Sequence, residues 1–307
     1  MAPVEREGGE ISDRRATPPS ATDHVKSSLS NLAWGLLGAG LGGANMVRHR
    51  LRGYRTPRPF GREDLNRDVE YSIGVVEAWR RVGLAVTGRR ILEVGPGPDL
   101  GTGFVLVALG AESYTAIDRF PLARDAHRAF YAALAERLSV DVAATFRRIR
   151  YVVSTVPPTA DLGESYDAIV SNATLEHLND VPAAFGWMAS VAAPGATHAH
   201  LVDAQTHMRW VRPRDPWNIL RYSDRVYSLA LAFPGSPNRL LASDYVREAN
   251  RAGIRLAVVA SDRASSEYVR RVRPFLARRF RYRDDDDLQL LTFMLVSGAV
   301  VDRMPNA

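Results

Sequence analysis

The segment ILEVGPGPDLGTG, residues 91–103, constrains the fold of this chain more than any other stretch. Apolar residues run into an acid, Glu93, and glycines follow at positions 95, 97, 101 and 103. The apolar run is typical of a buried strand, whereas glycine lets the backbone turn sharply and approach a ligand closely. Free N–H groups at the start of a following helix would complete a site for a nucleotide-like ligand. The segment therefore predicts a strand, a cofactor-binding loop and a helix in succession.

Strands and helices alternate through the rest of the chain, which favours a mostly parallel, doubly wound α/β sheet. The apolar runs predict strands near residues 90–95, 113–118, 149–154, 166–171, 197–203, 255–261 and 288–300. Helices are expected near residues 101–109, 120–138, 181–192 and 242–252. An amphipathic helix should precede them all, with Leu65, Val69, Ile73 and Val76 on one face.

Two segments of different composition precede this regular region. Residues 1–30 are polar and rich in Ser, Pro and Thr, which is typical of a disordered tail, and they lack the apolar core of a signal peptide. In residues 31–62, an apolar stretch with five glycines is followed by a stretch with six arginines. Because the apolar stretch is shorter than the roughly 20 residues that span a bilayer, we expect this segment to cap the main domain, residues 63–303. Peripheral contact with a membrane surface is the alternative role.

Charge and cysteine content narrow the choice of partners and compartment. The net charge is +6, and Lys26 is the single lysine among arginines. No basic–aromatic motif of an RNA or DNA reader is present, so we expect no nucleic-acid partner. The chain has no cysteine, which excludes disulfides and thiolate metal sites. We expect a cytoplasmic protein, and the sequence indicates no particular oligomeric state.

Three motifs distinguish between two kinds of cofactor-binding loop. A dinucleotide-binding loop requires Gly-x-Gly-x-x-Gly, but the third glycine here, Gly101, comes one residue too late. The chain instead combines Glu93 just before the first glycine, Asp118 at the end of YTAID, and the segment YDAIVSNATLEHL. Over about residues 65–262, these motifs resemble the class I S-adenosylmethionine-dependent methyltransferases. The NPPY-type signature of enzymes that methylate nucleic-acid bases is absent, with SNAT in its place.

The resemblance implies a seven-stranded Rossmann-like sheet with an antiparallel last strand, and S-adenosyl-L-methionine as the cofactor. The acid and glycines would wrap the cofactor's amino-acid and ribose portions, and the acid after the second strand would accept hydrogen bonds from the ribose hydroxyls. Cofactor binding is thus assigned to Glu93, Gly95, Gly97, Asp118 and Asn172. The chain departs from the family pattern near the adenine, where Asp161 is a weak substitute for the usual acid.

The connection after the fifth strand is too long for an ordinary loop. Residues 205–240, here called the lid segment, are rich in aromatic residues and predict a substrate lid. His200, Asp203 and His207 resemble a His-x-x-Asp-x-x-x-His pattern in some small-molecule members of the family, although strand alternation should point His200 away from Asp203. We assign catalysis to His177, Asp203 and His207, with a histidine as base and Asp203 orienting it.

Two other interpretations of these histidines stay open: metal binding, as in some sugar O-methyltransferases, and hydrogen bonds that anchor the lid segment. We assign no residue to a metal site. The sequence therefore predicts a transferase that moves a methyl group from S-adenosylmethionine to a small molecule, most simply at oxygen. The alternatives are a cofactor-binding module without turnover and an NAD-dependent dehydrogenase.

Overall fold

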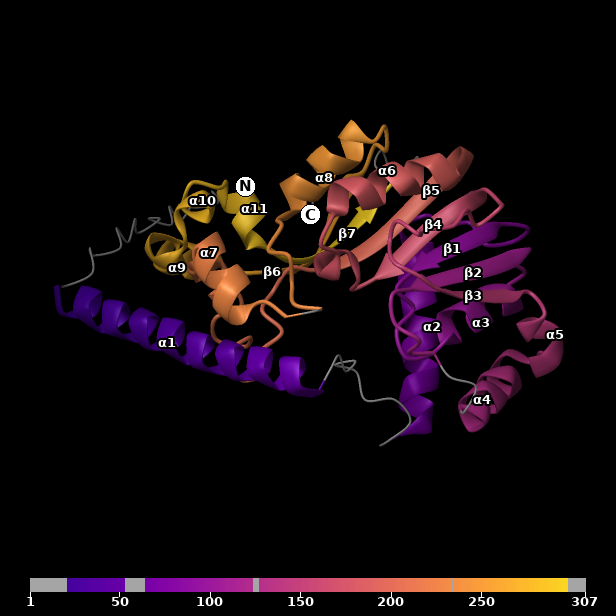
Figure 1. Ribbon diagram of the computed structural model, residues 1–307, viewed down its shortest axis with the longest axis horizontal. Helices are drawn as coiled ribbons and strands as arrows, with labels where there is room; N and C mark the ends of the chain where they lie inside the picture. Colours follow the sequence, from indigo (N-terminus) through magenta and orange to yellow (C-terminus); the bar gives the residue numbers. More distant parts are fainter. Residues whose placement is uncertain (1–20, 53–63, 124–126, 234, 298–307) are drawn as a thin grey trace, which may run out of the picture.

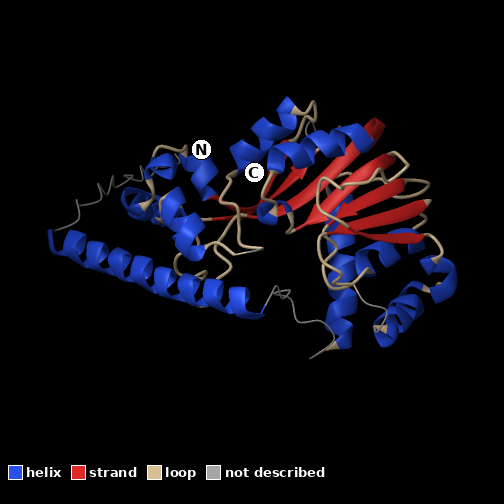
Figure 2. Ribbon diagram, in the orientation of Figure 1, coloured by secondary structure: helices blue, strands red, loops and turns tan. Residues whose placement is uncertain are grey.

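The computed structural model describes residues 21–52, 64–123, 127–233 and 235–297. Residues 1–20 of the expected tail, 53–63 of the arginine-rich segment and 298–303 at the end of the expected domain lie outside the described residues. A seven-stranded sheet with the order β3-β2-β1-β4-β5-β7-β6 forms the centre of the described part (Figures 1 and 2).

Strands β1 to β5 run parallel, and β7 pairs antiparallel with both β5 and β6. This arrangement confirms the predicted fold class, including the antiparallel last strand. The strands are β1 (Arg90–Val94), β2 (Ser113–Asp118), β3 (Ile149–Val153), β4 (Tyr166–Asn172), β5 (Ala192–Asp203), β6 (Ala257–Arg263) and β7 (Leu290–Val296). All seven expected strands are present, and β5 begins earlier than the sequence pattern indicates.

Helices cover both faces of the sheet (Figure 1). One face carries α2 (Leu65–Arg81), α3 (Gly101–Ala108), α4 (Arg128–Leu138) and α5 (Val142–Phe146). The opposite face carries α6 (Val181–Val191) and α8 (Ala242–Arg251). Short helices α9 (Ser266–Val272), η4 (Arg273–Phe275), α10 (Arg278–Arg281) and α11 (Asp285–Gln289) fill the excursion between β6 and β7. The sequence pattern predicts none of these four, because each is too short to show a period.

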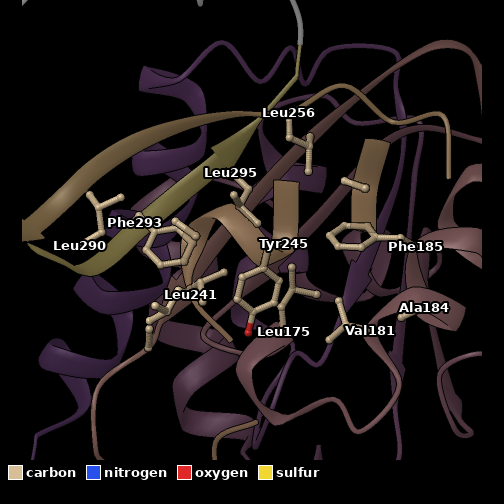
Figure 3. Close-up of a cluster of buried hydrophobic side chains, with 14 of the residues drawn as sticks. Leu175, Val181, Ala184, Phe185, Leu241, Tyr245, Leu256, Leu290, Phe293 and Leu295 are labelled. Carbon is tan, nitrogen blue, oxygen red and sulfur yellow. The ribbon is translucent and has the colours of Figure 1, made fainter. Parts of the chain in front are cut away.

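Strand alternation divides the apolar core into two layers. Ile91 and Tyr114 face the α2 side, whereas Leu92 and Ile117, on the same two strands, face the α6 side. Figure 3 shows part of the second layer, where Tyr245 of α8 lies between side chains of β7 and of α6. Both layers are closely packed, so the sheet is a rigid support for the loops at the carboxyl ends of its strands.

Local signals explain where the helices begin. Asp64 caps α2 by accepting a hydrogen bond from the N–H of Asn66 at 3.0 Å. Asp180 caps α6 in the same way through Ala183 at 2.9 Å, and Pro182 occupies its first turn. Helix α4 starts later than predicted, at Arg128, because the segment after β2 turns through Pro121 instead of entering a helix.

Helix α1 (Ala21–Arg52) begins inside the segment expected to be a tail and lies along the lid segment (Figure 1). The lid segment contains η2 (Asn218–Arg221), α7 (Asp224–Val226) and the π-helical turn η3 (Tyr227–Leu231). Asn218 donates to the Trp34 carbonyl at 2.9 Å, and Tyr222 donates to the Gly35 carbonyl at 2.7 Å. A Cβ at Gly38 would lie 1.9 Å from the Asn218 side chain. The glycines of α1 therefore permit a close helix contact.

Candidate functional site

The glycine-rich loop joins β1 to α3 and takes a conformation that favours glycine. Gly95 has φ +73° and Gly97 has φ +79°. A Cβ at Gly95 would lie 2.3 Å from the Thr174 side chain, so this glycine lets the loop pack against the segment after β4. A Cβ at Gly97 would meet nothing within 4 Å. Gly97 thus faces open space, where a ligand can approach the backbone.

Asp118 ends β2 beside this loop. Its carboxylate accepts hydrogen bonds from the N–H of Gly97 at 3.3 Å and of Phe120 at 2.9 Å. Burial raises the pKa of Asp118, and these backbone donors oppose the rise. The fixed carboxylate keeps spare lone pairs, which suit hydroxyl donors on a ligand.

Glu93 lies on β1 and is 1% exposed. Its Oε2 accepts hydrogen bonds from the hydroxyls of Thr102 at 2.5 Å and Tyr114 at 2.6 Å. Burial raises the pKa of Glu93 to about 7, although both hydroxyl donors lower it. A cationic ligand group nearby would stabilise the charged form of this acid.

A cavity of about 410 Å³ opens above the loop, within the size range of small-molecule sites. All five residues predicted to bind the cofactor line it, and so does His177. Residues that the motif analysis did not identify also line it, including Tyr71, Phe120, Thr155 and Val156. Three other hollows, of about 860, 590 and 500 Å³, are larger, but none is lined by a residue predicted to bind the cofactor.

Tyr71 and Asn172 join α2 to the end of β4 at this cavity. The Asn172 amide donates to the Tyr71 hydroxyl at 2.8 Å. Thr155 and Val156 follow β3 and line the cavity, whereas Asp161, the weak substitute for the family's acid near the adenine, does not. A polar residue just beyond a strand's carboxyl end is the signal that could have identified Thr155.

A cluster of titratable groups lies beside the cavity. Glu176 and His177 belong to the turn η1 (Leu175–His177) after β4, and His207 follows β5. One ligand atom from each of these three residues lies within 4.8 Å of the others. The rings of His177 and His207 meet edge to face, with centroids 4.9 Å apart. We call Glu176, His177 and His207 the Glu–His–His cluster.

The expected catalytic residues are thus brought together, but with different partners from those predicted. The Asp203 carboxylate pairs with Arg212 at 2.6 Å, and its backbone N–H donates to Glu176 Oε1 at 3.2 Å. The Gln205 carbonyl, not a carboxylate, accepts from His207 Nδ1 at 3.0 Å. This bond leaves Nε2 of His207 as the ring atom with a free lone pair.

His200 lies away from this cluster. It is 0% exposed, and its Nδ1 lies 3.0 Å from the Ser171 hydroxyl. Side chains three residues apart on a strand point to opposite faces of the sheet. This position is therefore consistent with the predicted orientation of His200 away from Asp203.

Burial controls the protonation of the cluster. It raises the pKa of Glu176 to about 8, and the charge of Asp203 adds to the rise. It lowers the pKa of His177 to about 3, with a further contribution from His207. It also lowers the pKa of His207, against the attraction of Asp203. At neutral pH, the two imidazoles are therefore uncharged.

The residues present fit the cofactor that the motifs imply. Gly97 leaves space at the loop, Asp118 offers acceptors for hydroxyls, and Glu93 places an acid where an amino group can meet it. The ribose of the cofactor carries such hydroxyls, and its amino-acid portion carries such an amino group.

Comparison with known proteins identifies one family. The family described as "Methyltransferase domain" matches residues 67–231, more than half of the 307-residue chain. A search of curated proteins finds no match.

Solved structures with a similar fold include an S-adenosylmethionine dependent methyltransferase from Mesorhizobium loti, with 16% identity, a TM-score of 0.44, and coverage of 76% of this chain and 99% of that chain. Another is an O-methyltransferase family protein from Burkholderia thailandensis, with 15% identity, a TM-score of 0.42, and coverage of 76% and 57%. A third is the N-methyltransferase NodS from Bradyrhizobium japonicum WM9, with 14% identity, a TM-score of 0.37, and coverage of 74% and 95%. Likeness at this level says nothing about the methyl acceptor.

Proposed function

The chain belongs to the S-adenosylmethionine-dependent methyltransferase family, and from this premise we propose that it methylates an oxygen atom of a small molecule. The observation that supports this proposal is the position of His177, which lines the cofactor cavity and also belongs to the Glu–His–His cluster. Groups that handle protons thus lie next to the place where the methyl group is presented.

Five residues hold the cofactor in this proposal. Gly95 and Gly97 shape the loop around it, Asp118 accepts from the ribose hydroxyls, Glu93 faces the amino group, and Asn172 closes the acceptor side. The bound cofactor supplies a methyl group already activated on a sulfonium. The protein therefore chiefly aligns the acceptor oxygen and removes its proton.

We assign the acceptor side to the Glu–His–His cluster. A hydroxyl must lose its proton to become a good nucleophile, and this cluster supplies uncharged imidazole lone pairs beside the cavity. Asp203 is a positioning residue, since its N–H holds Glu176 and its carboxylate holds Arg212.

Binding and turnover test this proposal separately. S-adenosylhomocysteine should raise the melting temperature and NAD should not, and Asp118→Ala should weaken S-adenosylhomocysteine binding more than about tenfold by removing a charged acceptor. Stronger stabilisation by NAD would contradict the cofactor assignment of these residues.

Transfer is measured with methyl-labelled cofactor on a panel of small hydroxyl and amine compounds. His207→Ala should slow methylation of a hydroxyl acceptor by at least about 100-fold while leaving S-adenosylhomocysteine affinity within a few-fold, because His207 does not line the cofactor cavity. Methylation confined to amines, or normal turnover by His207→Ala, would contradict the proposed reaction.

We also propose that α1 makes a peripheral membrane contact. Among the described residues, no helix is long and apolar enough to cross a bilayer. The face of α1 away from the lid segment nevertheless exposes leucines, with Leu36 67% and Leu51 80% exposed, and arginines follow at its end. Such a helix suits an anionic lipid surface.

Sedimentation with anionic and with zwitterionic vesicles tests the contact. The chain should sediment with the anionic vesicles only, and Leu36→Glu should abolish this without changing the melting temperature. Equal sedimentation of Leu36→Glu would contradict the assignment to α1.

A further inference from the structure

We propose that the Glu–His–His cluster binds a divalent transition-metal cation such as Zn²⁺. Two imidazoles and one carboxylate are a recurrent ligand set for such ions, found in zinc enzymes and in mononuclear iron sites. Among the residues that the structure describes, this is the one group of three potential ligands found close together. The chain has no cysteine to compete for the ion.

The backbone brings the three ligands together from two adjacent strands. β4 and β5 are parallel neighbours, so the segments that follow them meet at the same edge of the sheet. Their ligand atoms already lie within 4.8 Å of one another. Zinc bonds of about 2.0–2.2 Å would require each ligand atom to move inward by less than about 1 Å, which side-chain rotation can supply.

Hydrogen bonds around the cluster orient the ligands as outer partners do in metal sites. His207 donates from Nδ1 to the Gln205 carbonyl at 3.0 Å, which directs the lone pair of Nε2 away from that bond. The Asp203 N–H holds one oxygen of Glu176 at 3.2 Å, leaving the other oxygen for the ion. Two of the three ligands are therefore positioned before the ion arrives.

Two atoms of the cluster lack the partners that buried polar atoms normally have. Glu176 Oε2 and His177 Nδ1 are buried and make no hydrogen bond with a described residue. Leaving such atoms unsatisfied destabilises the folded state, so a folded protein seldom keeps them without a function. A cation bound by Glu176 and His177 would compensate for the missing bonds.

The surrounding charges permit a cation. Arg212 is a positive group near the cluster, and Asp203 neutralises it through an ion pair at 2.6 Å. Glu176 is 1% exposed and has a pKa of about 8, so a bound cation would displace its proton and bind the carboxylate. The nitrogen ligands favour a transition metal over Mg²⁺ or Ca²⁺, which prefer oxygen ligands throughout.

A cation held by three protein ligands keeps at least one open coordination position. Since His177 lines the cofactor cavity, this position could hold the oxygen of the methyl acceptor and lower its pKa. With the ion bound, the imidazole lone pairs would be metal ligands, so the hydroxyl proton would pass to solvent and not to a histidine. This role rests on the proposed function and specifies it: the acceptor would be a hydroxyl compound that coordinates the ion. Binding of the ion itself does not depend on that role.

Metal binding is tested on the full chain without a histidine tag, after treatment with a chelator and dialysis. Titration with Zn²⁺ should show one site tighter than about 1 μM by calorimetry. Co²⁺ should give the visible absorption of a low-coordinate site with nitrogen and oxygen ligands. Glu176→Gln and His207→Gln should each weaken the site by more than about 100-fold, since even outer partners contribute 10–100-fold.

His127→Gln is the matched control, because it removes a histidine outside the cluster and should leave the site intact. S-adenosylhomocysteine affinity serves as the check on folding, since neither Glu176 nor His207 lines the cofactor cavity. If Glu176→Gln loses that affinity, His207→Gln alone decides. The proposal would be overturned if the wild type bound no Zn²⁺ at a defined site, or if the folded cluster variants bound Zn²⁺ as tightly as the wild type does.

The same preparation separates this proposal from the proposed function. If Zn²⁺ binding depends on the cluster but the chain methylates only amines, the metal-site proposal stands and the hydroxyl acceptor is rejected. Hydroxyl methylation that persists in chelator, with no Zn²⁺ site by calorimetry, would keep the proposed function and reject the metal site.

Discussion

Replacing Glu93 by glutamine should change how folding stability depends on pH. Burial raises the pKa of Glu93 from 4.5 to about 7 in the folded chain, so the folded state holds this proton more tightly than the unfolded state does. The Glu93 contribution is therefore fully present below about pH 4.5 and is lost as the pH rises to about 7. Glutamine carries no such proton, and its amide oxygen can still accept from Thr102 and Tyr114.

The magnitude follows from the two pKa values. A difference from 4.5 to about 7, at about 1.36 kcal/mol for each pKa unit, corresponds to about 3 kcal/mol. The free energy of unfolding of Glu93→Gln, measured relative to the wild type, should thus increase by about 3 kcal/mol between pH 4.5 and pH 8. The protonated wild type and the glutamine variant should be most alike at the acidic end.

Urea unfolding at half-unit steps of pH, without cofactor, measures this difference. Other buried acids such as Glu176 titrate in both proteins and cancel in the comparison. Glu136→Gln, which changes an exposed glutamate, should show no comparable trend. A difference between Glu93→Gln and wild type that stays constant across this range would refute the reasoning, because it would mean that Glu93 ionises normally in the folded chain.

Three further predictions concern packing. Gly95 and Gly97 both have positive φ, so alanine strains the backbone at either position. Gly95→Ala should destabilise the fold more, because its Cβ would also lie 2.3 Å from a threonine side chain, whereas Gly97→Ala has no such contact and should in addition weaken S-adenosylhomocysteine binding. Calorimetry and thermal unfolding separate the two effects, and the reverse ranking would contradict the assignment. Gly38→Leu should release α1 from the lid segment and speed tryptic cleavage near its end, whereas Gly40→Leu, which meets nothing within 4 Å, should not. Trp217→Ala should lower the free energy of unfolding by about 3–5 kcal/mol, because the indole is 0% exposed and donates to a buried carbonyl; a loss below 1 kcal/mol in urea unfolding would mean that the lid segment unfolds separately.

Local patterns in the sequence were enough to predict the sheet and the cofactor loop. Strand periodicity, the glycines at 95 and 97, and an acid at the end of β2 are all features of short segments. Backbone geometry fixes their consequences directly: side chains alternate along a strand, and parallel strands present their carboxyl ends at one edge. The cavity residues Glu93, Gly97 and Asp118 were therefore identified from short motifs and from the family that these motifs resemble, without knowing what packs around them.

Only the tertiary structure decided which distant groups became partners. It placed Asp203 against Arg212 and left His207 to the Gln205 carbonyl, and it brought Glu176 into contact range of His207 across neighbouring strands. It also set α1 against the lid segment, where the bonded residues Trp34 and Asn218 are 184 residues apart in sequence. Such contacts depend on the summed packing of the core and not on any local period, so the sequence pattern carries no signal for them.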